Sequence, residues 1–245
     1  MESPQVSNSQ NLFLKFLPED EYQRFLPDLE LTKFARGEKI YLPDEKIEYV
    51  YFPNNLVASV VANLENGSTI ETGVIGKDGI VGVEIVLSED AASREVNIQL
   101  AGECFRLKSE IFKAAFERSS FVRKQVLRYV GSYISQISQN SACLSFHEIE
   151  QRLSRWLLMF HDCSASDELK LTQEFIALML GVHRPSVSKS ANKLQEKGFI
   201  SYNRGKITIL NRKGLEDYSC ECYEVDKQFR NLWSVNGNEK NNCVI

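Results

Sequence analysis

Basic side chains that could hydrogen-bond to DNA gather in one stretch of the chain, from Leu171 to Gly214. This stretch holds eight Lys and Arg residues and only two acidic ones, which gives it a net charge of +6. The rest of the sequence holds 21 basic and 31 acidic residues and carries −10. Lysine and arginine bind phosphate oxygens and the O6 and N7 atoms of guanine. A basic segment in an acidic chain therefore predicts double-stranded DNA as the leading partner.

The same stretch has the pattern of two short helices joined by a tight turn. Thr172 can cap the first helix, and apolar residues then recur at helical spacing. Gly181 follows at a position suited to the left-handed backbone that ends a helix. Val187, Ala191 and Leu194 would face inward from the second helix. This pattern predicts a helix-turn-helix.

The outward side of the second helix carries polar and basic residues. They are Arg184, Ser186, Lys189, Asn192 and Lys193. The N-terminal end of a recognition helix enters the major groove, whereas phosphate contacts position the protein without reading sequence. The residues assigned to phosphate are Thr172, Ser188 and Lys193, with Arg204 and Lys206 on a predicted hairpin. A solvated basic face without DNA is the alternative, which the turn glycine, the paired helices and the hairpin disfavour.

From Glu148 to about Tyr223, the sequence resembles the winged helix-turn-helix of the Crp/Fnr family of bacterial transcription regulators. The stretch LTQEFIALMLGVHRPSVSKSANKLQEKGFISYNRGKITIL follows the family pattern in register over its whole length. By this resemblance the base-reading residues are Arg184, Pro185, Ser186 and Lys189. Pro185 stands where the best-known members have an acidic residue, so the preferred half-site should differ from theirs.

Short apolar runs separated by glycine, with Asn-Gly and Asp-Gly turns, fill the first half of the chain. Many short strands predict a sandwich or barrel, and the resemblance identifies it as the family's β-roll. The fold class expected is α+β, in three parts. These are an N-terminal β-roll like a cyclic-nucleotide-binding domain (13–115), a long dimerisation helix (116–146) and a C-terminal winged helix-turn-helix (147–223).

A heptad pattern marks the predicted dimerisation helix. Its apolar seam consists of Leu127, Val130, Ile134, Ile137 and Leu144. Such seams bury themselves against a partner helix, although the sequence alone also allows a helix buried within one chain. The two-fold symmetry common among helix-turn-helix proteins favours a homodimer, as does the resemblance. A hinge is expected between Ser141 and Glu148.

The family's cyclic-nucleotide cassette is degenerate here. In binding members, a Gly-Glu turn opens a short helix, and an Arg-Ser pair about ten residues later holds the phosphate. Gly82 fits the turn, but Val83 stands at the glutamate position and Ser93 at the arginine position. A shift of one residue would pair Glu84 with Arg94. We therefore expect no cyclic nucleotide to bind.

No other cofactor and no metal is expected from the sequence. An iron–sulfur sensor usually needs four cysteines, and none occurs before Cys104. Cys143 and His147 share a predicted helix face, while Cys220 and Cys222 form a separate pair. The residues of both pairs are interpreted as side chains that pack between helices. No haem motif, catalytic triad or metal-ligand spacing is present, so an enzyme is not expected.

The whole sequence indicates a cytoplasmic regulator. No segment approaches the roughly 20 apolar residues of a membrane span, the N-terminus has no signal-peptide pattern, and the six cysteines lack a disulfide spacing. The expected function is a homodimeric transcription regulator that binds a pseudo-palindromic DNA site, with RNA polymerase as a further partner and no membrane. The alternative is a β-roll regulatory or scaffold protein whose helical domain binds protein, which the basic segment disfavours.

Overall fold

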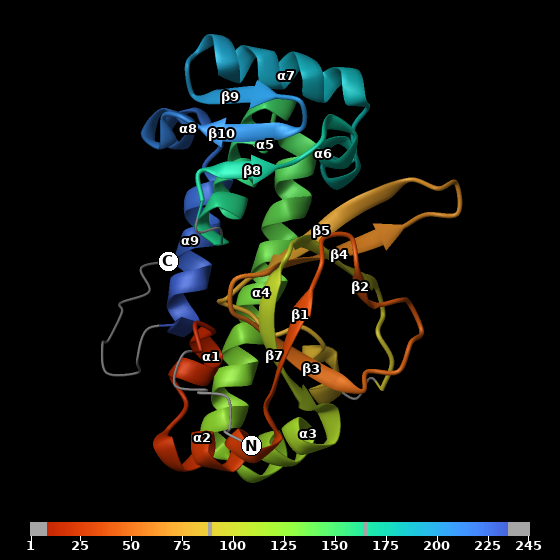
Figure 1. The fold of residues 1–245 in the computed structure, drawn as a ribbon, viewed down its shortest axis with the longest axis vertical. Helices are drawn as coiled ribbons and strands as arrows, with labels where there is room; N and C mark the ends of the chain where they lie inside the picture. The colour runs from red at the N-terminus through yellow and green to blue at the C-terminus, as the bar shows by residue number, and fades with distance from the viewer. Residues whose placement is uncertain (1–8, 88–89, 164–165, 235–245) are drawn as a thin grey trace.

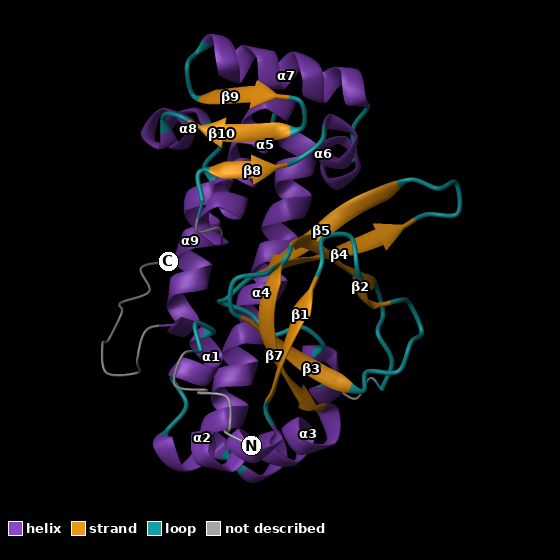
Figure 2. Ribbon diagram, viewed as in Figure 1, coloured by secondary structure: helices purple, strands orange, loops and turns teal. Residues whose placement is uncertain are grey.

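The computed structural model describes residues 9–87, 90–163 and 166–234. An N-terminal region rich in strands is followed by a long helix and then by a smaller region of helices and short strands (Figures 1 and 2). The predicted α+β class and the order of its parts are confirmed. Within the described residues, no helix has both the length and the apolar character needed to cross a bilayer.

Two antiparallel sheets form the β-roll. In strand order, the first contains β1 (Glu30–Phe34), β7 (Gly102–Lys108) and β3 (Tyr49–Pro53). The second contains β2 (Lys39–Tyr41), β6 (Glu95–Leu100), β4 (Val57–Asn63) and β5 (Thr69–Ile75). The predicted Asn-Gly turn joins β4 to β5, where Gly67 has a φ of 82° that a side chain would penalise.

Short helices close the ends of the β-roll. They are α1 (Leu12–Lys15), α2 (Glu19–Phe25), η2 (Leu26–Asp28), η3 (Val83–Val86) and α3 (Ser109–Arg118). Phe13 of α1 stacks on Phe52 at 5.5 Å between ring centroids, and both rings contact Phe112 of α3. These three buried rings join the helices to the first sheet, because large apolar surfaces are stabilised by removal from water.

The long helix α4 (Ser120–Phe146) presents two different faces. Val122 and Val126 are fully buried in the β-roll core. Leu127 and Ile134 of the predicted seam remain 51% and 57% exposed. His147 ends the helix in an extended conformation, and α5 begins two residues later, so the break lies inside the range predicted for the hinge.

The C-terminal region surrounds a second apolar core. It contains α5 (Ile149–Cys163), β8 (Glu168–Lys170), α6 (Gln173–Leu180), α7 (Arg184–Glu196), β9 (Ile200–Asn203), β10 (Lys206–Ile209) and α8 (Arg212–Tyr218). Its strands form a third antiparallel sheet in the order β8-β10-β9. The last helix, α9 (Cys222–Ser234), extends past residue 223 and returns along α4 (Figure 1).

The two regions are packed against each other. Val57, Val61 and Val74 of the second β-roll sheet belong to the core of the C-terminal region. The side of this sheet away from the β-roll core therefore packs against the C-terminal region, and α6 contacts β5 directly. The position of the helix-turn-helix depends on both regions.

Candidate nucleic-acid interface

Helices α6 and α7 form the predicted helix-turn-helix. The Thr172 side chain caps α6 by accepting a 3.2 Å hydrogen bond from the Phe175 backbone N–H. Gly181 ends α6 with φ 61° and ψ 41°, as predicted. Val187, Ala191 and Leu194 are buried to 1% exposure or less and fix α7 against α5 and α6. Since these three residues face inward, the opposite side of α7 must face outward.

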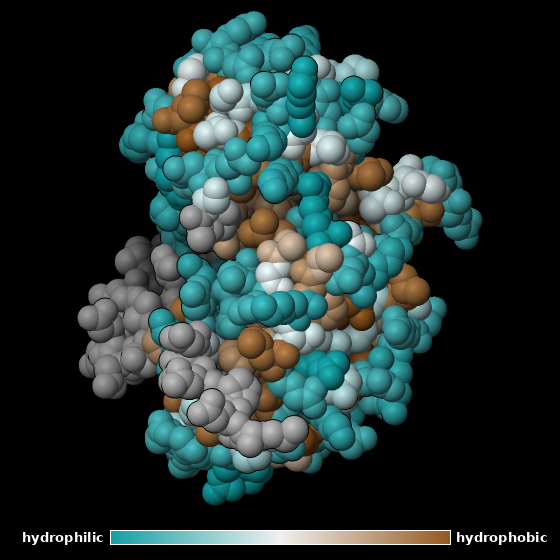
Figure 3. Space-filling model, viewed as in Figure 1, coloured by the Kyte–Doolittle hydropathy of each residue, from teal (hydrophilic) through white to brown (hydrophobic). Residues whose placement is uncertain are grey.

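The outward side of α7 carries the residues predicted to read bases. Arg184, Pro185 and Lys189 are exposed, and Ser186 is half-buried. All four lie in the N-terminal part of the helix. Helix α7 lies at the outer end of the molecule, away from the β-roll (Figure 1). In the space-filling view, the surface over α7 is largely hydrophilic (Figure 3). The helix is therefore accessible to a nucleic acid.

Arg184 has an acidic neighbour within the motif. Its Nε lies 3.0 Å from a carboxylate oxygen of Glu174 on α6, and both side chains are about 60% exposed. An exposed pair of this kind is worth only ~0–1 kcal/mol. Guanine or phosphate of a bound DNA can therefore replace the Glu174 carboxylate as the partner of Arg184 at little cost in free energy. Within the described chain, Lys189 has no ion-pair partner.

The hairpin between β9 and β10 forms the predicted wing. Arg204 (φ 47°) and Gly205 (φ 77°) both adopt left-handed backbone conformations at its tip, which is the signature of a tight two-residue turn. Arg204 is exposed there. Lys206 starts β10 and lies 3.0 Å from Glu168 on the neighbouring β8. Both basic residues lie at the same end of the hairpin.

Two residues predicted to contact phosphate are less accessible than expected. Lys193 makes an ion pair with Glu150 on α5, and this hydrogen bond raises the pKa of Lys193. The turn of α7 directs residue 193 toward α5. Ser188 is half-buried. A phosphate role for Lys193 would require its contact with Glu150 to be exchanged for the nucleic acid.

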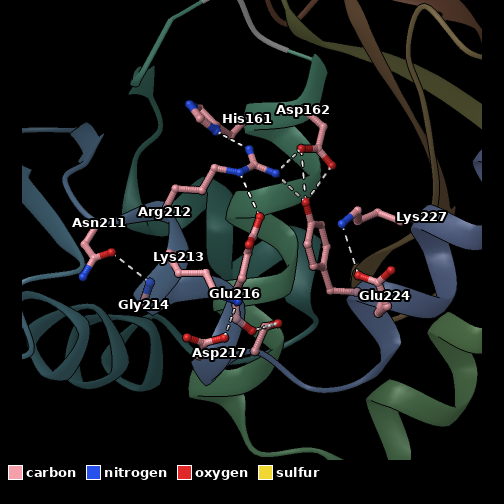
Figure 4. Close-up of polar contacts among 12 residues, drawn as sticks. His161, Asp162, Asn211, Arg212, Lys213, Gly214, Glu216, Asp217, Glu224 and Lys227 are labelled. Carbon is pink, nitrogen blue, oxygen red and sulfur yellow. Dashed lines mark hydrogen bonds and ion pairs between the residues drawn. The ribbon is translucent and has the colours of Figure 1, made fainter.

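Arg212, one of the eight basic residues of this segment, is turned inward (Figure 4). It donates hydrogen bonds of 2.6 Å to Asp162, 3.0 Å to Glu216 and 2.6 Å to the Tyr223 hydroxyl. Neighbouring Lys213 pairs with Asp217 at 2.7 Å. The charge available to DNA is therefore smaller than +6 and lies on α7 and the wing.

The β-roll also contacts the helix-turn-helix, a relationship that the sequence does not reveal. The Arg36 guanidinium lies 4.8 Å from the centre of the Phe175 ring and donates to the Lys170 carbonyl. A Cβ at Gly181 would lie 2.7 Å from Cδ1 of Ile70 on β5. Since Arg36 and Lys170 are separated by 134 residues, no local pattern could predict this contact.

The two charged residues of the degenerate cassette do not form an ion pair with each other. Gly82, with φ 81°, opens η3 as predicted, and Val83 is buried. Burial raises the pKa of Glu84. Ser93 and Arg94 are exposed, and Arg94 donates to the Ser93 carbonyl at 2.9 Å. Among the described residues, Glu84 and Arg94 form no ion pair, so the shifted alignment does not bring its two charges together.

Comparison with protein families and curated proteins supports the assignment of this region. Residues 151–218 match the family model of the Crp-like helix-turn-helix domain. The chain is 22% identical over 196 residues to the Global nitrogen regulator of Synechococcus elongatus, a match that covers 75% of this chain and 86% of the relative. It is 24% identical over 196 residues to the Transcriptional regulatory protein btr of Bordetella pertussis, covering 76% of this chain and 80% of that protein.

Solved structures with the same fold cover most of the chain. FixK2 from Bradyrhizobium japonicum matches with a TM-score of 0.68 and 17% identity, over 78% of this chain and 98% of that one. A transcriptional regulator of the CRP family from Thermus thermophilus matches with a TM-score of 0.64 and 22% identity, over 77% and 96% of the two chains. These likenesses establish the shared fold.

Proposed function

Because residues 151–218 form a Crp-like helix-turn-helix domain on the fold of the Crp/Fnr regulators, we propose that this chain is a sequence-specific DNA-binding transcription regulator that acts as a homodimer on a pseudo-palindromic site. The observation that carries the proposal is the uncovered outer side of α7. Arg184 and Lys189 are exposed there, and a buried apolar face holds the helix in place.

In this proposal, the N-terminal part of α7 enters the major groove and reads bases. Arg184, Pro185, Ser186 and Lys189 are the reading residues. Phosphate contacts come from Thr172, Ser188, Lys193, Arg204 and Lys206. The hydroxyl of Thr172 already accepts the α6 cap bond, which leaves its proton free for a phosphate oxygen.

The homodimer would form along α4. Leu127 and Ile134 stand exposed on α4. Ile137 and Leu144 are half-buried, and the partly buried Val130 also packs against the β-roll core. A second α4 would cover this seam. The two α7 helices would then meet half-sites about one helical turn, or ~34 Å, apart.

Regulation would act at the break between α4 and α5. An effector that binds better to one geometry of this hinge would increase the population of molecules in that geometry and so change the separation of the two recognition helices. We propose that this effector is not a cyclic nucleotide, because Arg94 is exposed and does not reach Glu84. RNA polymerase is the partner expected once the dimer is on DNA.

Selection of randomised duplex DNA by the purified full-length protein tests this function. We expect enrichment of a two-fold site whose half-sites are a turn apart, with an affinity that falls steeply as salt rises. Selection in the presence of cell extract supplies a missing effector. Absence of enrichment under both conditions, with binding insensitive to salt, would contradict the proposal and favour a helical domain that binds protein.

A further inference from the structure

Four nitrogen and sulfur donors meet where α4 ends and α9 begins. Cys143 lies in the last turn of α4, and His147 is the residue that ends this helix. Cys220 and Cys222 lie at the connection from α8 to α9. The Sγ atoms of the three cysteines and one ring nitrogen of His147 all lie within 4.8 Å of one another. We call these four residues the thiol–histidine cluster.

The distances within the cluster suit a tetrahedral metal ion. With zinc–sulfur bonds of ~2.3 Å, ligand atoms at the corners of a tetrahedron lie about 3.8 Å apart. The Sγ atoms of Cys143 and Cys220 are 3.5 Å apart, and Cys222 Sγ lies 3.4 Å from His147 Nδ1. Small side-chain movements would therefore bring all four atoms onto one ion.

The cluster is buried and separate from both apolar cores. Cys143, Cys220 and Cys222 are 1%, 3% and 0% exposed, and they group with one another rather than with either core. Three cysteines and one histidine form a ligand set typical of closed structural zinc sites, and thiolates select zinc over magnesium or calcium. Burial of all three thiols also protects such a site from solvent.

Neighbouring polar groups hold the donors in ligating orientations. The Nε2 atom of His147 lies 3.2 Å from the Glu221 carboxylate, which leaves Nδ1 facing the thiols. Carboxylates commonly fix metal-binding histidines in this way. Gln139 donates a 2.9 Å hydrogen bond to Cys222 Sγ, so a second ligand atom is also oriented.

Two arginines lie beside the cluster. Arg152 and Arg155 line the same cavity as Cys143. Three thiolates around one zinc ion carry a net charge of −1, which a buried site must compensate. Because Arg155 already pairs with the buried Asp226 at 2.7 Å, the guanidinium of Arg152 is the group that provides this compensation. It does so without competing as a ligand, since arginine does not lose its proton.

We propose that Cys143, His147, Cys220 and Cys222 bind one zinc ion per chain and so fasten the start of α9 to the junction of α4 and α5. Each thiol that ligates the ion releases its proton to solvent. The proposal goes beyond DNA binding and does not depend on it. Since Cys143 and His147 lie at the end of α4, and Cys220 and Cys222 lie where α8 is connected to α9, the bound ion would limit the movement of these C-terminal helices relative to α4.

Cobalt substitution in the full-length protein tests the site. The protein is reduced, stripped with a chelator and titrated with Co²⁺ under anaerobic conditions. We expect one equivalent to give the visible bands of tetrahedral cobalt and a near-ultraviolet thiolate charge-transfer band. One equivalent of Zn²⁺ should abolish both. Zinc should also raise the unfolding temperature of the stripped protein, because a ligand that binds only the folded state stabilises it.

Variants assign the ligands, and a matched cysteine provides the control. Cys222→Ser and His147→Gln should abolish stoichiometric binding or lower the affinity strongly, and Glu221→Gln should weaken it about 10-fold or more. Cys163→Ser alters a half-buried thiol outside the cluster and should bind like the wild type. If the reduced wild type stays colourless with cobalt and gains no stability from zinc, or if Cys222→Ser and His147→Gln bind as it does, the proposal is wrong.

Discussion

The indole Nε1 of Trp156 donates a 2.8 Å hydrogen bond to the buried carboxylate of Glu71. Trp156 lies on α5 of the C-terminal region and Glu71 on β5 of the β-roll, and both residues are 5% exposed. The Ser59 hydroxyl also donates to this carboxylate, and the Asn140 side chain donates to the Glu71 backbone carbonyl. One acidic residue thus links both regions and the long helix.

The Glu71 carboxyl should make stability depend on pH. Burial raises its pKa from the ordinary 4.5 to about 7, although the hydrogen bonds from Ser59 and Trp156 oppose the rise. The folded state therefore holds this proton more tightly than the unfolded state. Its contribution to the free energy of unfolding is complete below pH 4.5 and decreases as the pH rises to 7.

Glu71→Gln removes this titration. As the pH rises from about 5 to about 8, wild type loses the stability contributed by this proton, whereas the variant does not. We therefore expect the free energy of unfolding of the variant, minus that of wild type, to increase by up to about 3 kcal/mol over this range, since one pKa unit corresponds to ~1.4 kcal/mol. Urea unfolding at several pH values measures the difference. Glu65→Gln, at an exposed turn, is the control. A difference between Glu71→Gln and wild type that is independent of pH would refute the raised pKa.

Arg184→Ala and Lys206→Ala should affect DNA binding differently. Loss of a base-reading arginine should cost about 1–3 kcal/mol at the preferred base and relax specificity there. Loss of Lys206 should weaken binding to all sequences alike and lower the salt slope by about one. Fluorescence anisotropy with the selected site and single-base variants measures both effects.

Lys213→Ala is the control for these variants, because Lys213 is an exposed lysine of the same region that pairs with Asp217 on α8. It should leave affinity and the salt slope close to wild type. Equal losses from Arg184→Ala and Lys206→Ala on every sequence would remove Arg184 from the base-reading set.

Leu127→Glu should prevent or weaken dimerisation. A charge placed in an apolar seam must be desolvated when the interface forms. We expect the dissociation constant of the variant dimer to be about 10-fold or more higher than that of wild type, which corresponds to a loss of ~1.4 kcal/mol in the free energy of dimerisation. Sedimentation equilibrium measures this change. Leu64→Glu, at a leucine 60% exposed on the β4–β5 turn, should not alter assembly. Equal behaviour of the two variants would exclude α4 as the interface.

Arg212→Ala should act on stability rather than on DNA recognition. The change leaves Asp162, Glu216 and Tyr223 without their shared donor (Figure 4), and we expect the free energy of unfolding to fall by roughly 1–3 kcal/mol. Lys213→Ala should change it by less than about 0.5 kcal/mol. Chemical denaturation compares the two. A large loss of DNA affinity in folded Arg212→Ala would instead place this residue at the interface.

Local patterns predict much of this chain correctly because the responsible forces act between near neighbours. Thr172 caps α6 through a backbone N–H three residues away, and Gly181 ends that helix because a Cβ is disfavoured at positive φ. The periodic burial of Val187, Ala191 and Leu194 follows from the helix repeat. The base-reading set and the dimer seam remain predictions from these same patterns.

The sequence by itself determined the α+β class, the helix-turn-helix and its basic outer side, because helical period, turn formation and local charge depend on residues that are close together in the sequence. Only the tertiary structure decided that Arg212 faces inward, that Glu71 meets Trp156, and that Cys143 and His147 lie beside Cys220 and Cys222. Contacts between residues far apart in the chain depend on how the helices and sheets pack, and packing is decided by the whole core rather than by a local segment.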